Sequence, residues 1–169
     1  MKKQSRKELY WGILSLMFLL SFACTTEQKF SIDYEQYQLE NGLDVIMHND
    51  NSDPIVALAI VYHVGSSREV VGRTGFAHLF EHMMFQQSEN VGQDQFFKKI
   101  QNAGGTLNGF TNKDATTYFE VVPKNALELI LWLESDRMGY LINTVTKSAF
   151  ANQQNVVQNE KRQGVDNRP

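Results

Sequence analysis

The chain has 169 residues, of which 42% are hydrophobic and 21% are charged, and its formal net charge is −3. This composition predicts at most one ordinary globular domain and argues against a disordered chain. Because the charge is not strongly basic, we do not expect nucleic acid to be a partner.

The first 23 residues have the pattern of an export signal. Four basic residues among the first seven precede an almost wholly apolar run from Leu9 to Ala23, which is short for a membrane span and suits the core of a signal peptide. Ser21-Phe22-Ala23-Cys24 resembles a bacterial lipobox, although the usual leucine is displaced by one place, to Leu20. We expect export to the bacterial cell envelope, with a lipid anchor at Cys24 in the membrane, on the periplasmic side or the cell surface. An ordinary secretory signal and an uncleaved anchor are the alternatives.

A polar linker is expected at residues 24–33 and a domain at residues 34–169. The Asn41-Gly42 pair, between residues 37–40 and 43–48, predicts a β-hairpin. Residues 55–64 are β-branched and mostly apolar, which predicts a central strand.

Residues 75–85 carry the candidate catalytic chemistry. His78 and His82 are four residues apart, and Glu81 directly precedes the second histidine. On a helix these three side chains share a face, so the two imidazoles can bind one Zn²⁺ while Glu81 reaches a water on the metal. This order is the inverted metallopeptidase pattern H-x-x-E-H. A pair of satisfied core histidines beside a surface glutamate is the alternative.

The other predicted elements follow in order. The helix of residues 75–85 is expected to be mostly buried, because apolar residues, Phe76 and Phe80 among them, surround its polar trio. Further helices are predicted at 94–103, 127–138 and 147–162, and strands at 106–111 and 116–122. The expected apolar faces are Phe96, Phe97 and Ile100 in the first of these helices, and Leu127, Ile130, Leu131 and Met138 in the second. Thr144 or Thr146 is the expected cap of the last helix.

A catalytic zinc site normally has three protein ligands and a water, so a third ligand is needed. Only His48, His63 and Cys24 remain as histidine or cysteine, and a carboxylate is therefore expected. Glu160 ends an inward-facing stripe of the last helix, where an unpaired carboxylate is costly. Spacing alone does not favour it over Glu128 or Glu134, and it is equally consistent with an ordinary surface glutamate.

Four stretches together resemble the N-terminal part of the pitrilysin/insulinase-type zinc metallopeptidases, which include the mitochondrial processing peptidase. Residues 72–85 are similar to the metal helix of that family, and residues 105–111 with 116–120 to its substrate-binding edge strand and neighbouring strand. Residues 131–138 are similar to a core helix, and residues 156–162 to the segment that gives the third ligand. The resemblance covers about residues 35–169.

The resemblance implies an α+β fold, with an antiparallel-rich sheet and helices packed on one face. It implies one Zn²⁺ held by His78, His82 and Glu160, with Glu81 as the catalytic base. It also implies a strand that binds peptide substrate by strand addition, and Phe110 would line the pocket next to the scissile bond. That strand comprises Asn108, Gly109, Phe110 and Thr111.

Two features depart from the family pattern. Gln153 stands where many members have a glutamate, seven residues before the third ligand. Family members also contain several such domains, so we expect this domain to be incomplete at its C-terminus. A second peptidase-like domain, downstream or separate, would then complete the groove.

The predicted function is a zinc-dependent endopeptidase that hydrolyses peptides or unfolded polypeptides, with water activated by Glu81. A non-catalytic partner subunit or a peptide-binding module on the same fold is the alternative, but such chains usually lose the metal motif. A structural zinc site would prefer four protein ligands, often cysteines, and the only cysteine lies in the targeting segment.

Overall fold

The computed structural model describes residues 30–166. The predicted export signal, Cys24 and most of the linker lie outside these residues. The chain divides into two compact units, residues 1–50 and residues 51–169, which are described separately. Within residues 30–166, no helix has the length and apolar character needed to cross a membrane.

The described part of the first unit is an antiparallel hairpin. Strand β1 (Glu35–Gln38) pairs with β2 (Asp44–Met47), in the register Gln38 to Asp44. The connection therefore spans residues 39–43 and is wider than the two-residue turn that Asn41-Gly42 predicts. The pair still makes this turn, because Gly42 has φ of 88° and the Asn41 side chain accepts the Leu43 amide at 3.1 Å.

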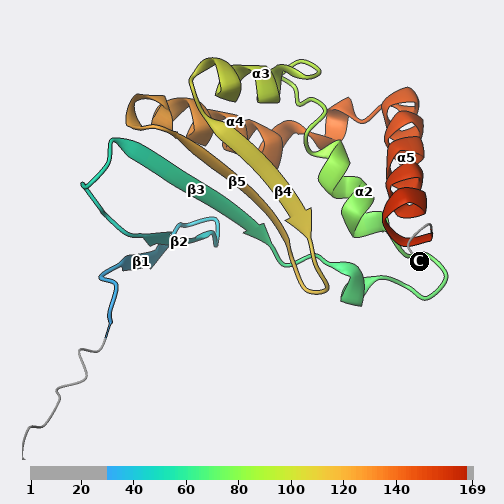
Figure 1. The fold of residues 1–169 in the computed structure, drawn as a ribbon, viewed down its shortest axis with the longest axis horizontal. Coiled ribbons are helices and arrows are strands. Elements are labelled where there is room, and N and C mark those ends of the chain that lie inside the picture. The colour runs from blue at the N-terminus through green and yellow to red at the C-terminus, as the bar shows by residue number, and fades with distance from the viewer. Residues whose placement is uncertain (1–29, 167–169) are drawn as a thin grey trace, which may run out of the picture. The chain divides into compact units, whose positions relative to one another are not determined.

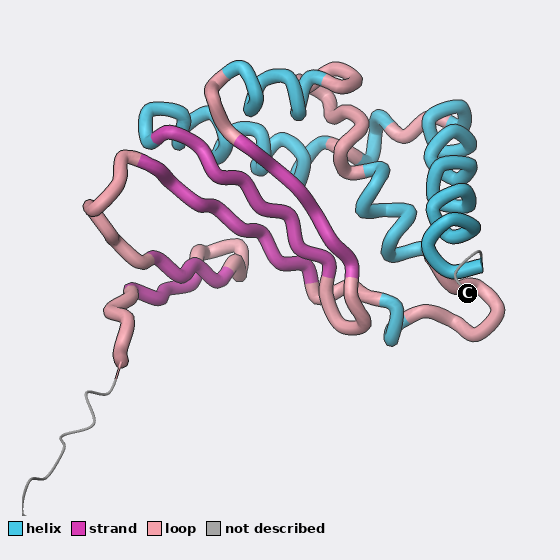
Figure 2. The backbone as a smooth tube through the Cα atoms, viewed as in Figure 1, coloured by secondary structure: helices cyan, strands magenta, loops and turns pink. Residues whose placement is uncertain are grey.

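The second unit is built on a three-stranded antiparallel sheet in the order β3-β5-β4 (Figures 1 and 2). Strand β3 covers Ile55–Tyr62, β4 covers Thr106–Thr111 and β5 covers Thr116–Pro123. β5 is the central strand, and β3 and β4 are edge strands among the described residues. The prediction of a central strand at residues 55–64 is therefore wrong in this sheet, because apolar composition does not record how many neighbours a strand has.

Helices cover one face of this sheet (Figure 1). Helix α2 (Phe76–Met83), α3 (Gln95–Asn102) and α4 (Leu127–Tyr140) contact the strands, and α5 (Lys147–Lys161) packs against α2. The short helices are η1 (Ser66–Arg68), η2 (Lys124–Ala126), η3 (Ile142–Thr144) and the π-type η4 (Arg162–Asp166). The structure confirms the α+β fold with helices on one face.

The core lies between the sheet and helices α3 and α4. It contains Val91, Phe96, Ile100, Val122, Ala126, Ile130 and Leu133. The buried residues of α4 are Ile130, Leu133, Glu134, Asp136 and Arg137, whereas Leu127, Leu131 and Met138 are exposed. The predicted apolar face of this helix is therefore right at Ile130 and wrong at the other three positions. Charged residues take buried places instead, and two of them, Glu134 and Arg137, pair with each other there.

Candidate metal centre

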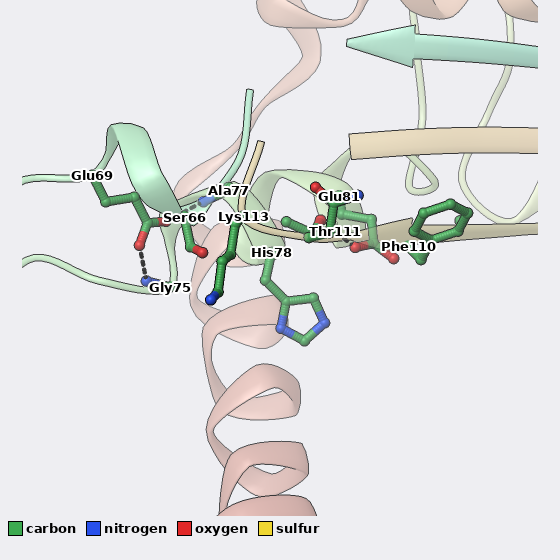
Figure 3. A pocket seen from close by; sticks show the side chains of 11 residues that line it. Ser66, Glu69, Gly75, Ala77, His78, Glu81, Phe110, Thr111 and Lys113 are labelled. Atoms are coloured by element: carbon green, nitrogen blue, oxygen red, sulfur yellow. Dashed lines mark hydrogen bonds between the residues drawn. The ribbon is translucent and has the colours of Figure 1, made fainter. Parts of the chain in front are cut away.

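Helix α2, which carries both histidines, begins at an unusual cap. Its N-cap residue, Gly75, has φ of 96° and supplies no side chain, so the first amides need another acceptor. The Glu69 carboxylate accepts the amides of Gly75 and Ala77, each at 2.8 Å (Figure 3). The hydrogen bond from Ala77, with those from Gly75 and Phe76, outweighs burial and lowers the pKa of Glu69. Sequence reasoning missed Glu69, because it precedes the helix by too many residues to form a recognisable capping motif.

Helix α2 is only partly buried, contrary to the prediction. Leu79 and Met83 face the interior, but Phe76 and Phe80 are exposed on the side away from the core. His78, Glu81 and His82 line one cavity together, so they share a side of the helix, as the periodicity predicts.

Three donor atoms from two helices meet at one point. His78 Nε2 and His82 Nε2 are 3.2 Å apart, one helical turn from each other on α2. Glu160 Oε2, on α5, lies 3.6 Å from the first nitrogen and 3.3 Å from the second. The packing of α5 on α2 brings this carboxylate to the histidines, and Thr146 begins α5 by accepting the Ala149 amide at 3.2 Å.

These separations fit one tetrahedral zinc ion. Ligand atoms about 2.0–2.1 Å from Zn²⁺ lie roughly 3.3–3.4 Å from each other when the geometry is tetrahedral. Within residues 30–166, this trio is the one group of at least three histidine, cysteine or acidic side chains close enough to share a metal. Of the two other carboxylates that spacing allowed, Glu134 is buried against Arg137 and Glu128 is exposed outside the trio.

The histidines are not core residues. The His78 side chain is 41% exposed and that of Glu160 is 47% exposed, while His82 is more covered. The alternative of satisfied core histidines therefore does not describe their surroundings. Gln153, seven residues before Glu160, is buried on α5.

Glu81 is buried on the same helix and faces strand β4. Its Oε2 atom accepts a hydrogen bond of 2.5 Å from the Thr111 hydroxyl. Glu81 and His78 line the same cavity (Figure 3). The carboxylate is therefore beside the three-atom cluster without being part of it.

The four predicted substrate residues lie on the edge strand β4 and divide between its two faces. Asn108 and Phe110 are exposed, whereas Gly109 and Thr111 face the helices. A Cβ atom on Gly109 would lie 3.0 Å from the Phe85 ring, so glycine allows that ring to pack against the strand.

Two cavities flank the cluster, and both are lined by His78 and Glu81. The larger has a volume of about 510 Å³ and also contains Phe110, Thr111 and Lys113 (Figure 3). The smaller, of about 370 Å³, is lined by His82, Glu160, Asn108 and the two aromatic residues Phe85 and Phe97. The two cavities therefore leave space along β4 for an extended peptide on both sides of the cluster. Sequence reasoning missed Phe97, which it assigned to a core face.

Comparison with known proteins adds family evidence to this geometry. Residues 44–169 match the profile of a family described as Insulinase (Peptidase family M16). A zinc protease of Helicobacter pylori, named PqqE, is 31% identical over 170 residues, which cover 100% of this chain and 38% of that protein. A probable mitochondrial-processing peptidase subunit beta of Schizosaccharomyces pombe is 25% identical over 129 residues, 76% of this chain and 28% of that subunit.

Solved structures agree with the fold. The crystal structure of a protease from Helicobacter pylori matches with a TM-score of 0.79 and 32% identity, covering 83% of this chain and 33% of that chain. Pitrilysin matches with a TM-score of 0.72 and 24% identity, covering 81% of this chain and 14% of that chain, and supports the fold alone. The chain spans 38% or less of the length of each of these relatives.

Proposed function

Because the chain belongs to the insulinase family of peptidases (peptidase family M16), we propose that it is a zinc-dependent endopeptidase domain acting on peptides or unfolded polypeptides. The observation that carries this proposal is the triangle of His78 Nε2, His82 Nε2 and Glu160 Oε2, with sides of 3.2, 3.6 and 3.3 Å. Family membership agrees with the resemblance that the sequence motifs indicate. The presence of the whole metal motif argues against the non-catalytic alternative.

The residues of this site would divide the work of peptide hydrolysis. His78, His82 and Glu160 would hold Zn²⁺, which supplies a Lewis acid that polarises the scissile carbonyl and acidifies water. Glu81, beside the cluster and held by Thr111, would take the proton of the attacking water and pass it to the leaving amine.

The edge strand β4 would hold the substrate. Its outer edge has no strand partner among residues 30–166, so its main-chain groups can bind an extended peptide. Binding through main-chain hydrogen bonds depends little on the side chains of the substrate. It requires a substrate segment that is unfolded. Phe110 would contact the substrate side chains that lie in the larger cavity.

We also propose that a second peptidase-like domain, later in the polypeptide or on a separate chain, covers the site. Half-exposed His78 and Glu160 leave the metal cluster open to solvent on this chain. One relative is named as a subunit of a processing peptidase, which supports a paired arrangement.

The proposed location is the bacterial cell envelope, with a lipid anchor at Cys24. The basic start, the apolar run and the Ser21-Phe22-Ala23-Cys24 sequence support this location. Metabolic labelling with a fatty acid should mark the wild type and not Cys24→Ser. An unlabelled wild type, or a labelled variant, would exclude the anchor.

Zinc analysis and peptide cleavage together test the proposed chemistry. The purified chain should bind about one zinc ion, and Glu160→Gln should lose most of it because one of three ligands is weakened. Glu81→Gln should keep its zinc and lose hydrolysis by about 10²–10⁴-fold. Glu128→Gln, an exposed change on α4, is the matched control and should change neither quantity.

Full zinc stoichiometry in Glu160→Gln would remove that residue from the site. Zinc-dependent cleavage that survives Glu81→Gln would mean that another group is the base.

A further inference from the structure

A chain of hydroxyl groups connects Glu81 to the end of strand β3. The Thr111 Oγ1 atom lies 2.5 Å from Glu81 Oε2 and 3.2 Å from Thr116 Oγ1. Thr116 is buried, and its hydroxyl donates to the Val64 carbonyl oxygen at 2.8 Å. Two threonine side chains thus connect helix α2, strand β4, strand β5 and the segment after β3.

We propose that Thr111 is a positioning residue for Glu81, with Thr116 as its support. Thr111 would hold the Glu81 carboxylate in one orientation, and Thr116 would hold the Thr111 hydroxyl against a fixed main-chain carbonyl. This inference rests on the proposed role of Glu81 as the base. It gives Thr111 a side-chain role separate from the main-chain contact that β4 would make with substrate.

The direction of the first hydrogen bond follows from counting protons. An ionised carboxylate only accepts, and each threonine hydroxyl has one proton to donate. The Thr111 proton must therefore go to Glu81. The single Thr116 proton is then shared between the Val64 carbonyl oxygen at 2.8 Å and the Thr111 oxygen at 3.2 Å, and the longer contact is the weaker branch of this three-centre hydrogen bond.

The stiffness of threonine makes this arrangement effective. A glutamate side chain has three rotatable bonds, whereas β-branched threonine is restricted at its single χ1 angle. Thr111 and Thr116 are direct cross-strand partners in the β4–β5 ladder, so their Cβ atoms are fixed by the sheet. A general base must lie within hydrogen-bond reach of its proton in the reactive geometry, and misplacement by about 1 Å can cost roughly 10²-fold in rate.

The sheet itself does not need these hydroxyl groups. The pairing of Thr111 with Thr116 is made by the main chain, and valine has the same shape and a high strand propensity. Replacing either threonine by valine should therefore keep the fold and the three ligands, and should remove only the contact with Glu81 or its support.

The first readout is structural and independent of activity. Crystal structures of the metal-free wild type, Thr111→Val and Thr111→Ser should show one Glu81 rotamer in the wild type and the serine variant. The valine variant should show Glu81 in several rotamers. The same single Glu81 rotamer in the valine variant would overturn the proposal.

The second readout is kinetic, at saturating zinc. Thr111→Val should lower kcat by about 10–100-fold with unchanged KM and zinc stoichiometry, and Thr111→Ser should restore most of kcat. Thr116→Val should give a smaller loss in the same direction. Thr117→Val is the matched control, because it makes the same change one residue away, on the opposite face of β5, and should change nothing.

The two proposals fail in different ways. A Thr111→Val loss that serine does not restore would overturn the positioning role while leaving Glu81→Gln inactive. Activity retained in Glu81→Gln would instead overturn the assignment of the base, and the rotamer comparison would still decide whether Thr111 holds Glu81.

Discussion

Arg137 is completely buried, and its guanidinium group lies among three aromatic rings. The group is 4.0 Å from the Tyr118 ring centroid, 4.5 Å from Phe96 and 5.3 Å from Phe85. Two hydrogen bonds from Arg137 reach the Glu134 carboxylate, while Glu120 lies further away, at 3.7 Å. One cation cannot balance two buried carboxylates, so one of these acids is expected to be neutral.

The neutral acid is Glu120. Burial, followed by the neighbouring carboxylate of Glu134, raises the pKa of Glu120 to about 9. Among the described residues, no hydrogen-bond donor serves either of its oxygens. Between its ordinary pKa of 4.5 and this value, the folded chain holds a proton that the unfolded chain has released. Wild-type stability is therefore lost progressively as the pH rises through this window.

Glu120→Gln should remove this pH dependence, because glutamine has almost the same shape and does not titrate. The free energy of unfolding of the variant, minus that of the wild type, should increase from pH 5 to pH 9. The slope for one proton is about 1.4 kcal/mol per pH unit. Denaturant unfolding at several pH values measures this difference, and Glu128→Gln on the exposed side of α4 serves as the matched control. A flat difference for Glu120→Gln would show that Glu120 is ionised in the folded chain.

At the scale of single residues, the sequence predicts contacts within one helix and misses contacts between helices and strands. The spacing of His78 and His82 was sufficient, because a helix fixes where its fourth residue lies. Glu160 could not be chosen from Glu134 by spacing, since the choice depends on how α5 packs against α2. The family resemblance provided that information. The contact of Thr111 with Glu81 joins residues 30 apart, and no local pattern indicates it.

At the scale of elements, the start of α2 depends on one carboxylate from a preceding loop. Glu69 satisfies two of the first amides of the helix that carries both histidines. The helix dipole also favours a negative charge at this end. Because the pKa of Glu69 is lowered in the folded chain, its contribution is present above the ordinary carboxyl pKa and is lost as the pH falls through the folded value.

Glu69→Gln should therefore destabilise the chain at neutral pH and have less effect in acid. The expected loss is about 2–4 °C in Tm at pH 7, the usual size for one helix cap in a chain of this length. The difference from wild type should shrink at an acid pH below the lowered pKa of Glu69, where the wild-type carboxyl group is protonated and uncharged like the glutamine. Thermal unfolding followed by circular dichroism at both pH values measures it. Glu40→Gln, an exposed change in the β1–β2 turn, serves as control, and an equal loss at both pH values would exclude a charge effect.

The bounds of the helices and strands were predicted more accurately than the residues that pack against them. Five elements lie within a few residues of their predicted bounds, because turns and periodicity are local signals. They are the strands β4 and β5 and the helices α3, α4 and α5. The buried face of α4 was predicted only at Ile130, since Glu134 and Arg137 look like surface residues until their partners are known. The wider β1–β2 turn likewise depends on strand register, which the Asn41-Gly42 pair does not determine alone.

At the scale of the whole molecule, two of the three proposed zinc ligands are open to solvent. The His78 and Glu160 side chains are 41% and 47% exposed, and both cavities at the cluster open to solvent. Electrostatic catalysis is strongest where water is excluded and the substrate is fixed on all sides. A single strand edge supplies main-chain hydrogen bonds to a peptide but does not cover it. The chain is therefore expected to bind zinc well and to hold substrate poorly.

The chain should be a much weaker peptidase than the Helicobacter pylori zinc protease, of which it matches 38%. With equal zinc occupancy and the same unfolded peptide, kcat/KM of the purified chain alone should be at least about 10²-fold lower. The reason is that orientation of a bound substrate supplies several kcal/mol of the barrier reduction, and among residues 30–166 only the edge strand β4 would hold the peptide. Glu81→Gln measures the background rate, and a chelator establishes metal dependence. Adding a polypeptide with a second peptidase-like domain should raise the rate of the wild type and leave Glu81→Gln inactive. Efficient, chelator-sensitive cleavage by the chain alone would show that no second wall is needed, and the catalytic groups of residues 69–160 would then be sufficient.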